Sequence, residues 1–291
     1  MLVYAILAGI LFGLYFSLVG LGLNLIFGVM RIVNLAHGDF IMLGALATIG
    51  LYAAYAVSPI LAAVAGLIAF AIIGFPLYYA LVPRLLKSAD PEMLSIILFF
   101  GLSQFIEAVA TIVVGPSEQS IPGAALGAHP VRLFGHPFPS AWVVSAAASV
   151  VAVVLVFAYL YRTRVGRLTR AVMSQRDEAL AAGINVDRVS ALAFGLGLGL
   201  AAIAGSFAPS MVGGITPAGG VGLTIVSFTV IIIGSLGSPL GTVLGGLVYG
   251  IALMVMQTYM SSWAGLLPYA LLVAILLVRP SGLLGRQVRR V

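Results

Sequence analysis

The chain has 291 residues, of which 62% are hydrophobic and 8% are charged, and its mean hydropathy is +1.19. A soluble domain carries about 25% charged residues, so this composition excludes an ordinary soluble protein and predicts a surface that mostly faces lipid. The chain has no cysteine, which excludes disulfide scaffolds, thiolate nucleophiles and Cys-ligated metals. The net charge of +6 does not indicate a nucleic-acid partner, because ten of the fourteen basic residues fall in just two segments, Arg162–Arg188 and Arg279–Arg290.

Basic residues gathered in loops beside apolar stretches indicate the cytoplasmic side of a membrane protein. We therefore expect both basic segments to be cytoplasmic, with the N-terminus outside and the C-terminus inside. No basic residue precedes Arg31, which agrees with an external N-terminus. The run Val3–Val29 lacks the basic region of a cleavable signal peptide, so we expect it to be retained as the first span.

Apolar stretches long enough to cross a bilayer as helices recur along the chain. They predict an all-α, polytopic transmembrane helical bundle of about eight full spans plus one short or broken segment, in a single transmembrane domain over residues 1–291. The short segment is Leu223–Leu236. The predicted full spans are Val3–Val29, Phe40–Val57, Ile60–Val82, Met93–Val114, Ala141–Tyr161, Ser190–Val212, Thr242–Met260 and Leu266–Val278.

Two places interrupt the apolar pattern, at residues 31–39 and 223–246. Short or Gly-interrupted apolar segments in corresponding positions of two halves are typical of internally repeated transporters. Irregular backbone is tolerated at membrane depth only where protein buries it or water reaches it, so both places should face the protein interior or a membrane surface. Tight turns between helices are the alternative, and the sequence leaves open whether either place is re-entrant. The polar residues of the first break are Arg31, Asn34, His37 and Asp39.

The predicted fourth span carries Ser103, Gln104, Glu107 and Thr111, a spacing that predicts one polar helix face. A carboxylate at membrane depth marks a transport path, a proton relay or a buried pair. We assign Asn34, His37, Asp39, Gln104 and Glu107 to the translocation path or to a helix junction, and the alternative for Glu107 is a purely structural, hydrogen-bonded role.

Motifs for catalysis and nucleotide binding do not occur. The sequence has neither a G-x-S-x-G elbow nor an H-E-x-x-H zinc helix, and His37, His129 and His136 are dispersed, so we expect no enzyme activity, cofactor or metal site. A Walker A motif requires Gly immediately before Lys, whereas the only lysine, Lys87, follows Leu86.

The segment between the fifth and sixth full spans predicts an amphipathic helix from Leu168 to Ala182, with Gly183 ending it and Asp187 capping the next helix. Such a helix either lies on a lipid surface or docks into a groove of another protein. Small alanines dominate its apolar face, which favours a protein groove. The predicted apolar positions are Leu168, Ala171, Val172, Ala179 and Ala182, interrupted by Gln175.

The run E178-A-L-A-A-G183 resembles the Glu-Ala-Ala loop of permease subunits of ABC importers, with Leu180 in place of the second Ala. Three further motifs resemble the branched-chain amino acid permeases in particular, and specifically the shorter of that family's two permease types. Ser235 departs from the Gly that is common in the family. These three motifs are N34-L-A-H-G-D-F-I-M-L-G-A-L-A47, G234-S-L-G-S-P-L-G-T-V-L-G-G246 and R279-P-S-G-L-L-G-R286.

The resemblance implies a permease domain without its own ATPase, in the bacterial inner membrane. Its partners would be a second related permease, two cytoplasmic ABC ATPases and a periplasmic substrate-binding protein, besides membrane lipid. Residues 162–189 would form the cytoplasmic coupling loop. The residues assigned to ATPase coupling are Gln175, Arg176, Asp177, Glu178, Ala179 and Gly183.

The substrate implied by the resemblance is leucine, isoleucine or valine, and related permeases also serve urea and short amides. An ion-coupled secondary transporter is a further alternative, for which only Asp39 and Glu107 could bind the coupling ion. A sugar permease of the same superfamily is a third alternative. Against it, this chain has N-L-A-H-G-D where that branch favours an acidic Ile-Asp-Leu-Ser type of sequence.

Overall fold

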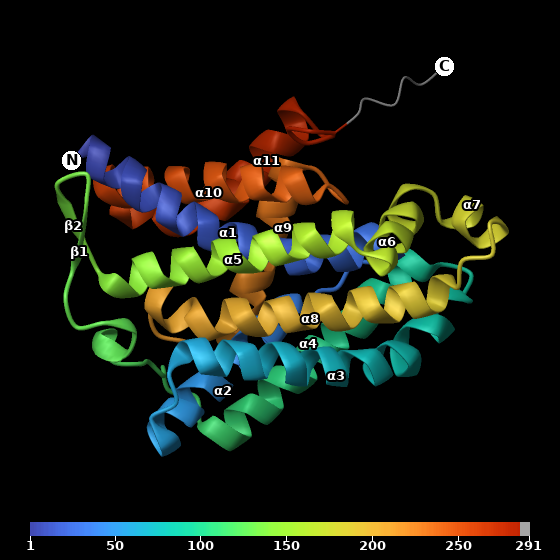
Figure 1. Ribbon diagram of the computed structural model, residues 1–291, viewed down its shortest axis with the longest axis horizontal. Coiled ribbons are helices and arrows are strands. Elements are labelled where there is room, and N and C mark those ends of the chain that lie inside the picture. The colour runs from blue at the N-terminus through green and yellow to red at the C-terminus, as the bar shows by residue number, and fades with distance from the viewer. Residues whose placement is uncertain (286–291) are drawn as a thin grey trace.

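The computed structural model describes residues 1–285, and most of its helices run along the long axis of the molecule (Figure 1). A small antiparallel hairpin of β1 (Val131–Leu133) and β2 (His136–Phe138), which pairs Val131 with Phe138, lies in the long loop before α5. The α-helices are α1 (Leu2–Met30), α2 (His37–Tyr55), α3 (Pro59–Leu86), α4 (Pro91–Val114), α5 (Ser140–Arg162), α6 (Arg164–Ser174), α7 (Arg176–Ala181), α8 (Val186–Met211), α9 (Gly220–Gly234), α10 (Pro239–Tyr259) and α11 (Leu267–Val278); the 3₁₀ helices are η1 (Gly123–Leu126), η2 (Pro217–Gly219) and η3 (Ser261–Leu266).

Nine helical segments within residues 1–285 are long and apolar enough to cross a membrane, which confirms the predicted polytopic all-α bundle. The predicted short segment is α9, whose 15 residues extend about 22 Å, less than the roughly 30 Å of a hydrocarbon core. In Figure 1, α9 crosses the direction of its neighbours instead of running beside them. The basic residues Arg286, Arg289 and Arg290 lie outside the described residues.

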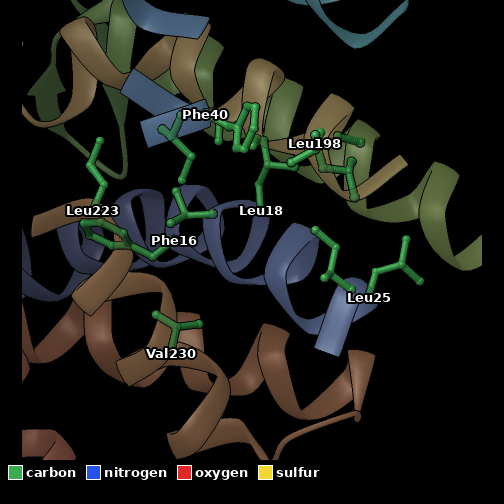
Figure 2. Packing of buried hydrophobic residues seen from close by; sticks show 14 of the residues in the cluster. Phe16, Leu18, Leu25, Phe40, Leu198, Leu223 and Val230 are labelled. Carbon is green, nitrogen blue, oxygen red and sulfur yellow. The ribbon is translucent and has the colours of Figure 1, made fainter. Parts of the chain in front are cut away.

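The core forms around α1 and α8, which are the most enclosed long helices. α8 packs against α1, α2 and α3, and α1 packs along α10. Figure 2 shows Leu18 of α1, Phe40 of α2 and Leu198 of α8 in this core. The α1–α10 contact is close because Gly13 and Gly250 bring the two backbones together, so that a Cβ on either residue would collide with the facing helix.

The two ends of the bundle differ in charge. The β1–β2 hairpin lies at one end, and α6 and α7 lie at the other (Figure 1). The alternating direction of the helices places Arg31, Arg84 and Lys87 at the α6–α7 end, together with the basic segment that contains those helices. By the positive-inside rule, we expect the α6–α7 end to be cytoplasmic, and the orientation stays a prediction.

We expect single cysteines at Ser120 and Ser174 to react with a membrane-impermeant maleimide from opposite sides of the membrane, Ser120→Cys from outside. Both serines are exposed and lie at opposite ends of the bundle, and no native cysteine interferes. The measurement is labelling of intact and of permeabilised cells. Labelling of both positions from the same side would refute the orientation.

Candidate functional site

The first break in the helical pattern is a buried, non-helical segment between α1 and α2. α1 ends at Arg31, which adopts the left-handed conformation (φ 57°) with its amide bonded to the carbonyl of Phe27. The next residues cannot continue the helix, and Asn34 instead accepts a hydrogen bond at Oδ1 from the amide of Ala36 at 3.1 Å. The segment therefore has backbone groups that need partners from other helices.

Thr224 of α9 supplies two of these partners. Its hydroxyl accepts from the amide of Gly38 at 2.8 Å and donates to the carbonyl of Leu35 at 2.9 Å. α9 approaches this closely because Gly38 and Gly220 face each other, and a Cβ at Gly38 would collide with the carbonyl of Gly220. A third contact joins the amide of Val33 to the hydroxyl of Ser95 in α4, at 3.4 Å.

Three of the four polar side chains of this break are enclosed, and the fourth, Arg31, is exposed. Asn34, His37 and Asp39 are each 0% exposed. His37 Nε2 lies 3.4 Å from the carbonyl of Val19, in hydrogen-bonding position. Within residues 1–285, the Nδ2 of Asn34, the Nδ1 of His37 and both carboxyl oxygens of Asp39 have no hydrogen-bond partner. The break thus retains unused hydrogen-bonding capacity in the interior of the bundle, where it is costly.

The predicted polar face of α4 divides in the structure. Ser103 is buried and, with half-buried Glu107, faces Asp39 of α2 without forming a bond of hydrogen-bonding geometry. Gln104 is exposed, because one residue along a helix turns the side chain by about 100°. Ser103 and Glu107 are therefore turned toward the inside of the bundle, and Gln104 is turned outward.

The second break is a tight turn between α9 and α10, which matches the turn alternative for that segment. Ser235 and Gly237 have positive φ (115° and 76°), and Ser238 caps α10 by accepting from the amide of Gly241. Asn24 in the C-terminal third of α1 holds this turn: its Oδ1 accepts from the amide of Gly237 at 2.6 Å, and its Nδ2 donates to the hydroxyl of Thr242. Sequence reasoning missed Asn24, although an amide within an apolar span is itself a signal.

The predicted single helix from Leu168 to Ala182 is wrong. Gln175 is extended (φ −148°, ψ 102°) and divides the segment into α6 and the short helix α7. The predicted apolar face also differs, because Leu168 is 40% exposed while Thr169 is fully buried. Gly183 ends the segment with a positive φ of 79°, as predicted, but Asn185 rather than Asp187 caps α8. Asp187 instead accepts from the hydroxyl of Tyr78 at 3.3 Å.

α6 takes its orientation from α5. The Nε of Arg170 donates to the carbonyl of Leu160 at 2.9 Å, and the guanidinium of Arg170 lies 4.4 Å from the ring centre of Tyr161. The hydroxyls of Tyr159 and Thr169 are 2.9 Å apart. These contacts turn Thr169 inward and Leu168 outward, which explains the difference from the predicted face.

α7 presents a different surface. Arg176 is half-buried with its Nη1 enclosed, and Ala179 is buried. Asp177 and Glu178 are exposed, and Leu180 is 63% exposed. An exposed leucine beside two carboxylates, on a six-residue helix at the end of the bundle, forms a small protruding surface with both apolar and acidic character.

α6 contacts both breaks, at the end of α1 and at the turn between α9 and α10, and forms a junction there. The side chain of Met173, at the end of α6, lies where a Cβ of Gly28 in α1 would be, and the Cα of Gly237 lies beside the same position. The guanidinium of Arg31 donates to the carbonyl of Met173 at 3.3 Å. A cavity of about 640 Å³ opens beside the junction, and its lining includes Arg176 and Glu92.

The terminal motif reaches the same place. The amides of Leu283 and Leu284 donate to the carbonyls of Ile233 and Gly234 at the end of α9, at 2.8 and 3.3 Å. The described part of the terminal motif, the turn between α9 and α10 and α6 therefore lie near one another, whereas the first motif continues along α2 from the break. In the part of the chain that the structure describes, no cluster of three or more His, Cys, Asp or Glu residues could hold a metal ion.

Comparison with known proteins gives a consistent result. Residues 5–276 match the family model described as the permease component of branched-chain amino acid transport systems. The high-affinity branched-chain amino acid transport system permease protein LivH of Escherichia coli strain K12 is 28% identical, over 96% of this chain and 94% of that protein. BraD of Pseudomonas aeruginosa, with the same description, is 27% identical over 96% and 94%. No solved structure matches the chain.

A third relative, from another organism, has a similar identity to this chain. A protein of Methanocaldococcus jannaschii, named as a probable branched-chain amino acid transport permease protein LivH, is 28% identical over 92% of this chain and 88% of its own length. All three relatives are named as permease proteins.

Thr224→Val should lower the free energy of unfolding by about 1 to 3 kcal/mol for each backbone group left unpaired, because valine keeps the shape but removes the bridging hydroxyl. Thr258→Val is the matched control, since the Thr258 hydroxyl bonds only to the carbonyl of Met254 in its own helix. The measurement is denaturation of the purified protein in detergent. Equal stability of the two variants would show that the Thr224 bridge does not stabilise the break.

Proposed function

The chain belongs to the family of permease components of branched-chain amino acid transport systems, and on this premise we propose that it is the membrane-spanning subunit of an ATP-driven importer of branched-chain amino acids. It forms the translocation path with a second, related permease in the bacterial inner membrane. A binding protein delivers the substrate from outside, and two cytoplasmic ATPases drive transport.

A partner must hydrolyse the ATP because the chain has no lysine that could serve in a P-loop. Its single lysine, Lys87, follows leucine, whereas the P-loop backbone needs glycine at that position to approach the phosphates. Uptake measured with an ionophore present and ATP retained separates this mechanism from ion-coupled transport, which would stop.

The observation that carries the coupling proposal is the exposed surface of α7. Leu180 is 63% exposed at the end of the bundle that carries the basic loops, and Asp177 and Glu178 flank it. An apolar anchor within a polar rim is the usual composition of a docking site that enters a groove. We assign α7 to the ATPase groove, with Leu180 as the anchor and the two carboxylates as its polar contacts.

The junction at Met173 supports a route from the ATPases to the membrane helices. α6 is bonded to α5 through Arg170 and contacts α1 through Met173 and Arg31. A displacement of α7 and α6 therefore acts on the end of α1 and on the turn between α9 and α10. Rocking of these helices about the two breaks gives alternating access to the two sides of the membrane.

The roles of the polar break follow from its bonds. Asn34 and His37 hold an irregular helix junction by hydrogen bonding, and Asp39 with Glu107 lies beside the translocation path. Urea or a short amide is the alternative substrate, because a separate binding protein selects it. Calorimetry of that binding protein against amino acids, urea and amides distinguishes these classes.

Glu178→Arg should abolish ATP-driven uptake in the reconstituted importer while the permease still folds and inserts, since a reversed charge at an exposed docking position opposes the partner's complementary surface. Ser120→Arg, an exposed substitution at the opposite end, should transport normally and serves as the control. Wild-type uptake by a normally inserted Glu178→Arg variant would exclude α7 from coupling.

A further inference from the structure

A second cavity, of about 690 Å³, lies at the end of the bundle opposite α6 and α7. Its walls come from α1, α5, α8, α9, α10, η3 and α11, with the loop of residues 213–216 on one side. This volume is within the range of roughly 300 to 1,000 Å³ that small-molecule sites occupy. The family assignment does not assign any role to this cavity.

Aromatic side chains form the floor of the cavity. The rings of Phe16 and Tyr249 meet edge to face, with centres 4.8 Å apart and an interplanar angle of 89°. Phe12 and Trp142 meet in the same way at 4.9 Å and 85°. Phe12, Phe16 and Tyr249 are each less than 5% exposed, so the floor is a rigid apolar surface fixed by the core.

Polar groups of the cavity are few and uncharged. Tyr249 is 2% exposed and contributes a phenol hydroxyl. Ser210, Thr216, Gln257 and Tyr269 add hydroxyl and amide groups. Among the described residues that line the cavity, no side chain carries a charge. An apolar floor with convergent neutral donors and acceptors is the usual composition of a site for a small, mainly apolar solute.

The loop of residues 213–216, on one side of the cavity, is bonded to the loop that follows α4. Gln119 and Ile215 exchange two backbone hydrogen bonds, of 2.9 and 2.8 Å, and the side chain of Glu118 packs against Gly214. Gly213, Gly214, Ile215 and Thr216 line the cavity on this side. The hydroxyls of Thr216 and Ser210 offer hydrogen bonds to the polar end of a ligand whose apolar part lies on the aromatic floor.

We propose that this cavity is a substrate site within the permease, which takes an aliphatic amino acid with its branched side chain on Phe12, Phe16 and Tyr249 and its polar end toward the loop of residues 213–216. The proposal rests on the proposed function and adds that the permease itself discriminates by the size of the apolar side chain. α1, α9 and α10 form both this cavity and the junction at Met173, so the coupling movement would also reshape the site.

The test is ATP-driven uptake of leucine and of valine by the reconstituted, fully assembled importer. Leu253→Trp fills part of the cavity from α10 and should lower the leucine-to-valine uptake ratio roughly tenfold, because one methylene in an apolar pocket discriminates by at least about that factor. Leu244→Trp, on an exposed part of α10 outside the lining residues, should leave the ratio unchanged. Comparing each variant with the wild type cancels the preference of the binding protein.

The outcomes separate the two claims. A wild-type importer that takes up acetamide or urea but neither leucine nor valine would refute the proposed function. Uptake of leucine by the wild type, with the same leucine-to-valine ratio in Leu253→Trp, would overturn the cavity proposal.

If the Leu253→Trp variant fails to assemble, a second measurement tests the proposal. Gln257→Cys at the cavity, without binding protein, should be protected from an impermeant maleimide by leucine but not by arginine, whose charge finds no counterpart in the lining. Equal labelling with and without leucine would overturn the proposal.

Discussion

The structure depends on one constraint: a chain that leaves helical geometry inside a membrane must find hydrogen-bond partners for its backbone within the protein. Here the partners are single side chains of other helices. Thr224 bonds to an amide and a carbonyl of the break between α1 and α2, and Asn24 bonds to the turn between α9 and α10. These bonds lock α1, α2, α9 and α10 together at their breaks. The breaks therefore become the places where a small displacement changes the packing of several helices at once.

α6 contacts this bonded network directly. Met173 lies between Gly28 of α1 and Gly237 of the α9–α10 turn, and Arg31 begins the first break. The opposite ends of the same helices form the apolar cavity. A displacement of α6 would thus be transmitted through packed backbone to the cavity where we propose that substrate binds. No separate chain of side-chain contacts is needed.

The spans and their order could be predicted from sequence because hydropathy alone decides which segments lie in lipid. The expected short segment is α9, of 15 residues, but α11, which was expected to be a full span, is shorter still, at 12 residues preceded by η3. The contacts inside the bundle could not be predicted from the sequence. Gln175 breaks the coupling helix because α6 folds back on α5 through Arg170, a tertiary contact without local sequence signal. Thr224 and Asn24 were missed, although each is a polar residue in an apolar helix. For the predicted polar stripe, helical geometry kept Ser103 with Glu107 but turned Gln104 outward.

The central claim is that the contact between Arg31 and Met173 transmits the work of ATP hydrolysis to the membrane helices. The most direct measurement is the number of substrate molecules imported per ATP hydrolysed by the reconstituted importer carrying Arg31→Ala, with Arg84→Ala as control because the Arg84 side chain bonds only within its own helix. Loss of the charged hydrogen bond should lower this ratio by roughly tenfold while ATP hydrolysis continues. An unchanged ratio in Arg31→Ala, in an importer that assembles normally, would contradict the account.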